Sequence, residues 1–252
     1  MKIVLIGGTG LIGSKLKQRL EGAGHEAVAA APATGVDTLT GKGLAEVLTG
    51  AQVVVDVSNS PSFEEDQAVL AFFQTAGKNL LAAEEAAGVR HHVAVSVVGA
   101  DRLPDSGYLR AKMVQESLVD ASPVPFTILR STQFFEFLGA IVSGGDDGDA
   151  IRLPDALLQS VAADDVADTL ADLAVAEPLQ GTVELGGPGA LPFVEFARRW
   201  LANRGDERTV TADPNAHYFG TRLQTDSLVA GPEARLGRVH LADWLGTPAA
   251  LR

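Results

Sequence analysis

Residues 2–20 of the chain read KIVLIGGTGLIGSKLKQRL, an apolar run, a cluster of glycines and a polar run with two leucines four residues apart, in that order. The first run, residues 2–6, is rich in β-branched side chains and is typical of a buried parallel strand. Residues 14–20 have the spacing of an amphipathic helix. The glycines between them fit both G-x-x-G-x-x-G and G-x-G-x-x-G, so their spacing does not choose between subfamilies.

A strand, a glycine-rich turn and a helix in this order predict a site for a dinucleotide pyrophosphate. One glycine permits the tight turn, another lets backbone N–H groups reach the phosphates, and a third lets the helix pack closely on the strand. The helix N-terminus adds partial positive charge. Glycines also serve ordinary turns and caps, but the flanking strand and helix favour nucleotide binding. The expected cofactor contacts are Gly7, Thr9, Gly10, Leu11, Ile12 and Gly13.

The length and composition allow one large α/β domain or one domain with an appended lobe. The chain has 252 residues, of which 46% are hydrophobic, enough for a substantial core. Residues 143–149 form its most loop-like run and are a candidate lid or lobe boundary. We expect a cofactor-binding domain over residues 1–150 and a smaller C-terminal substrate lobe over residues 151–252.

Charge, cysteine content and hydropathy exclude several classes of function. A net charge of −12 without a basic stripe disfavours nucleic acid as a partner. Without cysteine there is no disulfide, thiolate nucleophile or thiolate metal ligand. No stretch approaches the roughly 18 apolar residues of a membrane span, and the chain starts in a strand rather than in a leader. The expected location is the cytoplasm, the expected partner is a small molecule, and a homodimer is left open.

The end of the expected second strand, residues 24–31, bears on the choice of cofactor. In dinucleotide-binding folds an acid there binds the ribose 2′-hydroxyl, and an arginine binds a 2′-phosphate. Residues 31–34 read APAT and offer neither, with Pro32 expected at the cofactor. The missing acid leaves room for a phosphate, so the sequence favours NADP and leaves NAD open. Residues 36–38 are expected as a short third strand, with Asp37 either near the adenine or in a turn.

Small polar residues follow the strong buried strand at residues 52–57. Ser58 and Asn59 fall at its carboxyl end, where they are expected either to contact the cofactor or to cap a helix. Residues 64–87 have helical spacing, and the two phenylalanines of that helix, Phe72 and Phe73, are expected in the core.

Two adjacent histidines, His91 and His92, begin the next strand. Neighbouring side chains on a strand face opposite sides, and no acidic or histidine partner stands at ligand spacing. A metal site needs three or four convergent ligands, so no metal is expected here.

Ser96, Tyr108 and Lys112 form the candidate catalytic group. Tyr108 and Lys112 are four residues apart and hence on one face of a helix. A nearby ammonium stabilises a phenolate and is expected to lower the pKa of Tyr108, so that it exchanges a proton with a carbonyl or alcohol. Ser96, at the end of its strand, is expected to hold the substrate oxygen, and Lys112 to reach the nicotinamide ribose. An exposed helix carrying both residues by accident is the alternative.

The second half of the chain offers weaker signals. A strand at residues 125–130 precedes a phenylalanine-rich segment, residues 131–138, which is expected to anchor a helix or to wall an apolar pocket. Asp164 and Asp165 are expected to cap a helix that runs to residue 176. A strand and a helix are expected over residues 182–188 and 193–203.

Taken together, these segments resemble an atypical short-chain dehydrogenase/reductase of the NmrA-like branch. The matching pieces are residues 6–13, 79–83 with 88–91, 95–99, 108–112, 127–131 and 161–167, which span most of the chain.

The resemblance implies a doubly wound parallel sheet, the Rossmann fold, with a smaller C-terminal lobe over the substrate crevice. It implies NAD(P) along the glycine loop, with Asp37 near the adenine and Ser58 and Asn59 near the middle of the cofactor. It implies Ser96, Tyr108 and Lys112 as the reductase triad. One departure concerns an asparagine of extended relatives that relays protons, since Phe73 stands in its place.

The expected function is that of an NAD(P)-dependent oxidoreductase. Hydride would pass between the nicotinamide and a small carbonyl, alcohol or activated alkene, with Tyr108 handling the proton. Two alternatives stay open: a redox sensor that binds the cofactor without turnover, and an isomerase, epimerase or lyase that retains it. The substrate itself cannot be read from the sequence.

Overall fold

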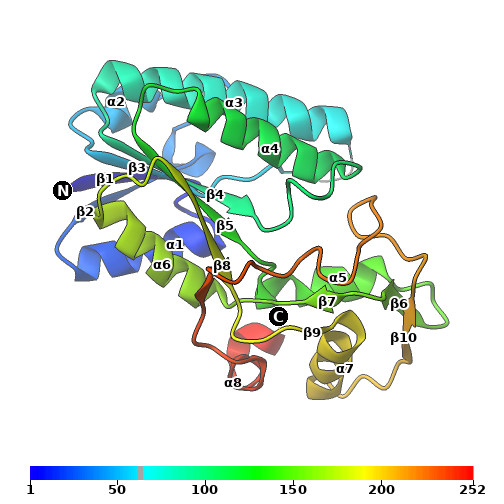
Figure 1. Ribbon diagram of the computed structural model, residues 1–252. Helices are drawn as coiled ribbons and strands as arrows, with labels where there is room; N and C mark the ends of the chain where they lie inside the picture. The colour runs from blue at the N-terminus through cyan, green and yellow to red at the C-terminus, as the bar shows by residue number, and fades with distance from the viewer. Residues whose placement is uncertain (62–64, 252) are drawn as a thin grey trace.

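The chain folds around a seven-stranded parallel sheet. The computed structural model describes residues 1–61 and 65–251, and in it the strand order is β11-β8-β5-β4-β3-β1-β2. All neighbouring strands pair in parallel. This confirms the expected doubly wound α/β fold (Figure 1). The strands are β1 (Lys2–Ile6), β2 (Glu26–Ala30), β3 (Val53–Asp56), β4 (His91–Val97), β5 (Phe126–Ser131), β8 (Gly181–Gly186) and β11 (Arg235–Leu236).

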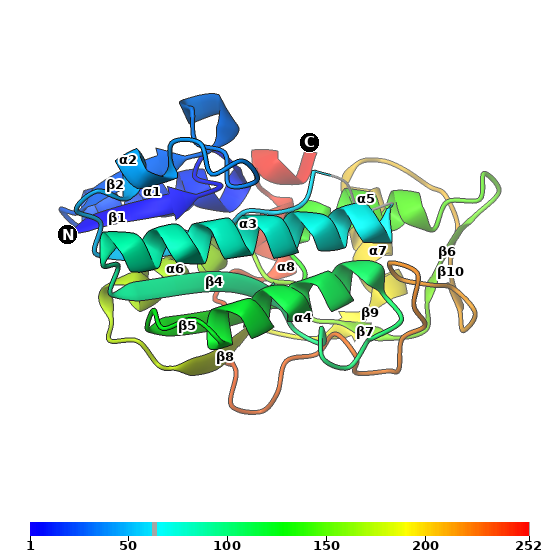
Figure 2. The same cartoon turned by 90° about the horizontal axis from the view of Figure 1, so that it is seen from above.

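Helices cover both faces of this sheet. One face carries α2 (Leu44–Leu48), α3 (Asp66–Ala87) and α4 (Gly107–Asp120), and the other carries α1 (Leu11–Gly22) and α6 (Ala163–Val175), as Figures 1 and 2 show. The strands are apolar on both sides because both sides are covered.

Strand β1, which lies between β3 and β2, shows how alternating side chains contribute to the core on each face of the sheet. Ile3 and Leu5 pack in the core under α1 and α6. Val4 and Ile6 pack in the core under α2 and α3. Successive side chains of a strand point to opposite faces, so one apolar run supplies both cores.

Two local expectations need correction. Residues 36–38 are not a strand of the sheet: Asp37 forms only an isolated bridge with Lys42, because the 3₁₀ turn η1 (Pro32–Thr34) carries the chain away directly after β2. The expected helix start at Glu64 lies outside the described residues, and α3 is described from Asp66.

A smaller lobe lies beyond the carboxyl ends of the strands (Figure 1). In it β6 pairs with β10 in parallel and β7 with β9 antiparallel. α7 turns an apolar stripe with helical spacing inward, Phe193, Phe196, Ala197, Trp200 and Leu201. The lobe contains η2 (Phe135–Phe137), α5 (Leu138–Gly144), β6 (Ile151–Pro154), β7 (Leu157–Leu158), β9 (Leu191–Pro192), α7 (Phe193–Asn203), β10 (Val210–Asp213), α8 (Leu241–Leu245) and η3 (Pro248–Leu251).

The expected boundary at residue 150 does not separate the main sheet and its helices from the smaller lobe. α6, β8 and β11 all come after residue 150 in the sequence, yet they complete the main sheet and its cover. The lobe is therefore built from segments that leave the main layer between β5 and α6 and between β8 and β11, together with the segment that follows β11.

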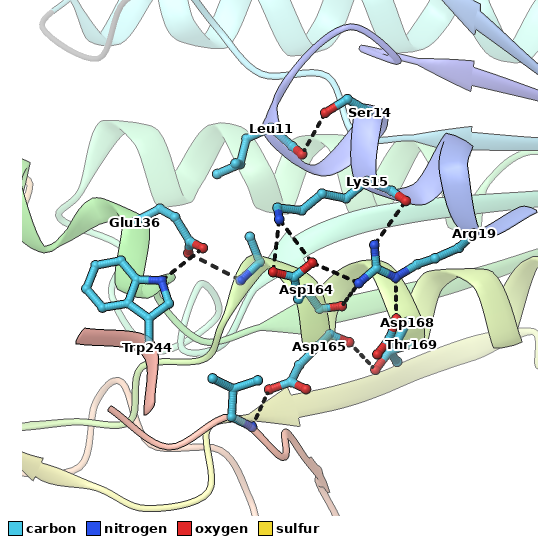
Figure 3. A network of polar contacts seen from close by, with 12 residues as sticks. Leu11, Ser14, Lys15, Arg19, Glu136, Asp164, Asp165, Asp168, Thr169 and Trp244 are labelled. Carbon is cyan, nitrogen blue, oxygen red and sulfur yellow. Dashed lines mark hydrogen bonds and ion pairs between the residues drawn. The ribbon is translucent and has the colours of Figure 1, made fainter. Parts of the chain in front are cut away.

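Ion pairs fasten α1, the helix that follows the glycine turn, to α6. Figure 3 shows Lys15 and Arg19 reaching the first turns of α6, where Lys15 Nζ lies 2.9 Å and Arg19 Nη2 2.8 Å from the Asp164 carboxylate. Arg19 Nε also contacts Asp168. The charges are partly exposed, so each pair adds little energy, but the shared geometry fixes how the two helices pack.

The two aspartates at the start of α6 do not cap it, contrary to expectation. The N-cap residue is Ala162, and the Ala163 N–H is accepted instead by Glu136 Oε2 at 3.2 Å, from the segment after β5. Asp165 Oδ2 accepts the backbone N–H groups of Arg238 and Val239, each at 3.0 Å. These carboxylates join α6 to distant segments, which local spacing does not reveal.

The glycine turn is packed too closely for a side chain at position 13, and this gives the first prediction. A Cβ at position 13 would lie 2.5 Å from both the Gly7 carbonyl oxygen and Gly8 Cα, closer than real Cβ atoms come. Gly13→Ala should therefore push α1 away from β1, lower the melting temperature, and weaken binding of the dinucleotide expected from the sequence at least tenfold. Thermal unfolding and titration calorimetry measure both.

The matched control is Gly22→Ala, at the last residue of α1, where no described atom lies within 4 Å of an added Cβ. Alanine is the better helix former by about 1 kcal/mol, so this variant should be as stable as the wild type or more so. Wild-type stability and wild-type dinucleotide binding in Gly13→Ala would show that position 13 has room for a Cβ.

Candidate active site

The glycine turn shapes a groove at the carboxyl ends of β1 and β3. Gly7 has φ +77°, a conformation that side chains rarely adopt, and a Cβ there would lie 2.9 Å from Ser58 N. Gly10 is the N-cap of α1 and brings no side chain to it. The first N–H groups of a helix lack intrahelical acceptors, so here they are available to an anion over the turn.

The groove brings together every residue expected at the cofactor except Lys112. Among the described residues that line it, none is a lysine or an arginine, and Asp37 alone carries a charge. The expected residues along it are Gly7, Thr9, Gly10, Leu11, Ile12, Gly13, Pro32, Asp37, Ser58 and Asn59. Segments more than 40 residues apart in the chain thus meet at one site because parallel strands end on the same edge.

Two side chains shape the far end of the groove. Asp37 Oδ1 accepts the N–H of Leu39 at 2.8 Å, the turn contact that was one of its two expected roles. Asn79 of α3 donates to the carbonyl oxygens of Thr38 and Leu39, both at 2.9 Å. The loop below the groove is therefore held from two sides.

The groove opens into a cleft that contains the whole candidate catalytic group. Ser96 lies near the end of β4, and Tyr108 and Lys112 lie on α4. Groove and cleft share Ile12, Val57, Ser58, Asn59, Phe134 and Phe137. A ligand that follows the groove from the glycine turn therefore ends beside the Tyr108 phenol.

The environment of Tyr108 differs from the expected one. Burial raises the pKa of its phenol to about 12, and a hydrogen bond with the Asn59 side chain lowers the pKa by less. The expectation that Lys112 brings the pKa of Tyr108 down is wrong for this structure. At neutral pH the phenol is protonated and is suited to give a proton rather than to take one.

The Lys112 ammonium is directed elsewhere. Its Nζ donates to the Val95 carbonyl oxygen at 2.7 Å and to Gln115 Oε1, and it lies 4.6 Å from the centroid of the Phe73 ring. Burial lowers the pKa of Lys112 to about 8, against the attraction of Asp56 and Glu116. Phe73 thus occupies the space beside the lysine.

A buried polar chain connects Lys112 to the groove. Gln115 Nε2 donates to Asp56 Oδ2 at 2.9 Å. Asp56 Oδ1 accepts the Ser58 hydroxyl at 2.6 Å and the Ser58 N–H at 2.9 Å. The sequence analysis did not predict a role for Asp56 or Gln115. Gln115 follows Tyr108 by seven residues and Lys112 by three, and this spacing places all three on one face of a helix.

Aromatic rings wall the cleft on the side of the lobe. Phe135 is 1% exposed and anchors the core, as expected, while Phe134 and Phe137 line both groove and cleft. Tyr218 and Phe219 also line the cleft, and the Phe219 ring lies 5.9 Å from the Tyr108 ring. Neither was expected, and no local signal marks them. Phe72, expected in the core, is half-buried and lines the groove.

The two histidines of β4 lie away from the cleft. His91 Nε2 lies 2.9 Å from Thr127 Oγ1. His92 Nδ1 lies 2.9 Å from the Glu84 carboxylate, an acidic partner that the spacing did not reveal. Within residues 1–61 and 65–251 the structure contains no group of three His, Cys, Asp or Glu side chains that could hold a metal ion.

Comparisons with known proteins agree with this geometry. A family described as NAD(P)H-binding matches residues 7–177, and the chain belongs to it. No curated protein matches the chain. Among the described residues, no helix has the length and apolar character needed to cross a membrane.

Solved structures with the same fold belong to relatives of low identity. MoeE5 in complex with UDP-glucose and NAD is 18% identical, with a TM-score of 0.76 over 100% of this chain and 98% of that one. UDP-glucose 4-epimerase from Thermus thermophilus is 17% identical, with a TM-score of 0.71 over 90% and 92%. A dTDP-4-dehydrorhamnose reductase from Clostridium acetobutylicum is 18% identical, with a TM-score of 0.71 over 97% and 91%. With the family match, they confirm the resemblance to atypical short-chain dehydrogenases/reductases.

His91, buried in β4 away from the cleft, gives a prediction on acid stability. Burial lowers the pKa of His91 to about 4, while an unfolded histidine titrates near 6.5. Below that value the unfolded chain binds the proton first, so the free energy of unfolding should fall by about 2 kcal/mol between pH 6.5 and 5 through His91 alone. Urea unfolding followed by circular dichroism measures this slope.

In His91→Gln the slope should flatten, whereas His240→Gln, the same change at an exposed position, should keep the wild-type slope. Identical slopes in all three proteins would show that His91 does not titrate in this range.

Proposed function

We propose that the protein is an NAD(P)-dependent oxidoreductase that interconverts a small carbonyl compound, or an activated alkene, with its reduced form. The observation that carries the proposal is the continuity of the glycine groove with the cleft that contains Ser96, Tyr108 and Lys112. A nicotinamide dinucleotide held along the groove supplies or accepts the hydride.

Residues of the cleft would protonate and hydrogen-bond the substrate oxygen. In reduction, the carbonyl carbon gains the hydride, the π electron pair moves to oxygen, and this oxygen takes the proton of the Tyr108 hydroxyl. Ser96 Oγ, buried and without a hydrogen-bond partner in the described part of the chain, would hold the same oxygen. Because the pKa of Tyr108 is raised to about 12, its proton is present throughout the physiological range, which supports reduction.

The charge of the cleft supports an uncharged substrate. Lys112 is the only charged residue among the described residues that line it, and its ammonium is already occupied by Val95 and Gln115. A sugar nucleotide such as the UDP-glucose bound by MoeE5 would bring a diphosphate to this cleft without a cation to pair it. The aromatic walls favour a small neutral molecule with an apolar body.

The charge of the groove supports NAD as the cofactor, in place of the NADP that the missing acid after β2 favoured. A 2′-phosphate carries about two negative charges at neutral pH. It would lie at the end of the groove that contains Asp37, with no lysine or arginine among the described lining residues.

Replacement of the phenol tests the proton donor. Tyr108→Phe should lower kcat of carbonyl reduction at least about 100-fold, because it removes the general acid, while the Kd for NADH stays within twofold of the wild type. The decrease of NADH absorbance with a panel of ketones and aldehydes measures the first, and calorimetry the second.

Tyr218→Phe is the matched control, since it makes the same change at the other tyrosine of the cleft and should cost less than tenfold in kcat. Full activity in Tyr108→Phe would exclude it as proton donor. Tight NADH binding with no turnover of any compound would favour a cofactor-binding regulator.

Titration with both dinucleotides tests the cofactor choice. NAD should bind at least tenfold more tightly than NADP, and Asp37→Asn should strengthen NADP binding several-fold while keeping an oxygen for the Leu39 N–H. Glu46→Gln, at an exposed acid of α2, makes the same charge change and should alter neither Kd. Tighter binding of NADP would overturn the choice, and binding of neither would overturn the proposed function.

A further inference from the structure

The cleft contains a second polar group that the proposed reaction does not use. Gln133 follows β5 and is 9% exposed, and its backbone carbonyl accepts the N–H of Val161 at 2.9 Å. Its side-chain oxygen Oε1 is buried and has no hydrogen-bond partner in the described part of the chain. A buried amide oxygen without a partner destabilises the folded chain, and at a ligand cleft a hydrogen-bond donor of the ligand can supply that partner.

The orientation of the Gln133 amide is set by Tyr218. The Gln133 side chain is hydrogen-bonded to the Tyr218 phenol, and this bond lowers the pKa of the phenol against the effect of burial. A hydrogen bond that lowers the pKa of a phenol comes from a donor, so the N–H side of the Gln133 amide faces Tyr218 and Oε1 is left for another partner. Tyr218 is held by a tight turn in which its N–H donates to Thr221 O at 2.8 Å and the Thr221 N–H donates back to Tyr218 O at 3.1 Å. Both Gln133 and Tyr218 line the cleft that contains Ser96 and Tyr108.

This tight turn is strained in a way that keeps its aromatic residues at the cleft. Phe219 has φ 46°, which is unfavourable for a residue with a side chain, and its ring packs on both Tyr218, at 4.8 Å, and Tyr108, at 5.9 Å. The turn around Phe219 thus places Tyr218 beside Gln133, although the two residues are far apart in the sequence. The contact between Gln133 and Tyr218 is therefore fixed by the fold and does not depend on a freely moving surface side chain.

Two buried and unpartnered polar atoms therefore share one cleft within the described part of the chain. Ser96 Oγ, on the strand adjacent to β5, is both a donor and an acceptor and suits a carbonyl oxygen. Gln133 Oε1 is an acceptor only, and it pairs with an O–H or N–H group of a ligand. No carboxylate lies among the described lining residues, so the donor that fits is neutral rather than an ammonium.

From these observations we infer that Gln133, oriented by Tyr218, is a specificity-determining residue that binds a hydroxyl group of the substrate. The substrate class is an uncharged hydroxy-carbonyl compound whose carbonyl oxygen meets Ser96 and Tyr108 and whose hydroxyl donates to Gln133 Oε1. This inference rests on the proposed reductase function and narrows its substrate.

The test compares substrates that differ only in the hydrogen-bond donor. The probes are cyclohexanone with its 2-hydroxy and 2-methoxy derivatives, and acetophenone with its 2-hydroxy and 2-methoxy derivatives, each assayed with the full chain and NADH. The wild type should show a kcat/KM at least tenfold higher for a hydroxy compound than for its methoxy analogue. The methoxy group keeps the oxygen and removes only the donor, so this ratio isolates the contact.

In Gln133→Leu the ratio should fall to within about twofold of unity, because the acceptor is gone while Tyr108 and Ser96 stay. Gln133→Glu keeps an oxygen acceptor and should retain most of the ratio. Gln74→Leu, the same change on the exposed surface of α3, should leave the ratio unchanged. Melting temperatures and the Kd for NADH, both expected to match the wild type, show that each variant is folded.

The outcomes separate the two proposals. Turnover of the parent ketones without preference for the hydroxyl, or an unchanged ratio in Gln133→Leu, overturns the role of Gln133 and leaves the reductase in place. If no probe is reduced, calorimetric titration of the same compounds into the NADH complex measures the hydroxy-to-methoxy ratio as a ratio of Kd. Absence of both turnover and hydroxyl-dependent binding overturns the subsite together with the proposed function.

Discussion

The close approach of backbone to backbone at the glycine turn is the constraint on which the other features depend. Gly13 brings α1 against Gly7 and Gly8, and Gly7 lies against the backbone of Ser58, at distances that leave no room for a Cβ. The start of α1, the end of β1 and the end of β3 therefore form one continuous surface. Only this surface lets helix N–H groups and the polar side chains after β3 face the same groove.

A buried chain of polar groups extends this surface into the cleft. Ser58, Asp56, Gln115 and Lys112 are linked in series, so the side chain beneath the groove and the lysine of α4 are held by the same carboxylate and amide. Burying such groups is costly unless each is paired, and here the pairing is arranged across β3 and α4. The chain gives Lys112 a structural role that does not involve the Tyr108 phenol.

The C-terminal lobe supplies one wall of the cleft. Its segments leave and re-enter the main layer, so Tyr218 and Phe219 reach the cleft from the far end of the sequence. Lys15 and Arg19 of α1 form ion pairs with α6, and Glu136, from the segment that starts the lobe, caps α6, so α1 is linked through α6 to the lobe. The position of the cleft wall thus depends on contacts between segments distant in the sequence.

The amino-acid sequence alone determined the parallel sheet, the glycine turn and the residues that line the groove, because each depends on local spacing: apolar runs, glycines at fixed intervals, and polar residues just after strands. The same spacing placed Tyr108 and Lys112 on one helix face. Local spacing could not predict the surroundings of these two side chains. Burial and a hydrogen bond with Asn59 set the pKa of Tyr108. The Lys112 ammonium donates to Val95 and Gln115. Only the tertiary structure decided that Tyr218 orients Gln133, that Phe72 leaves the core for the groove, and that Asp164 and Asp165 join distant segments instead of capping their helix. These contacts join residues far apart in the chain, and no local pattern encodes which of them will meet.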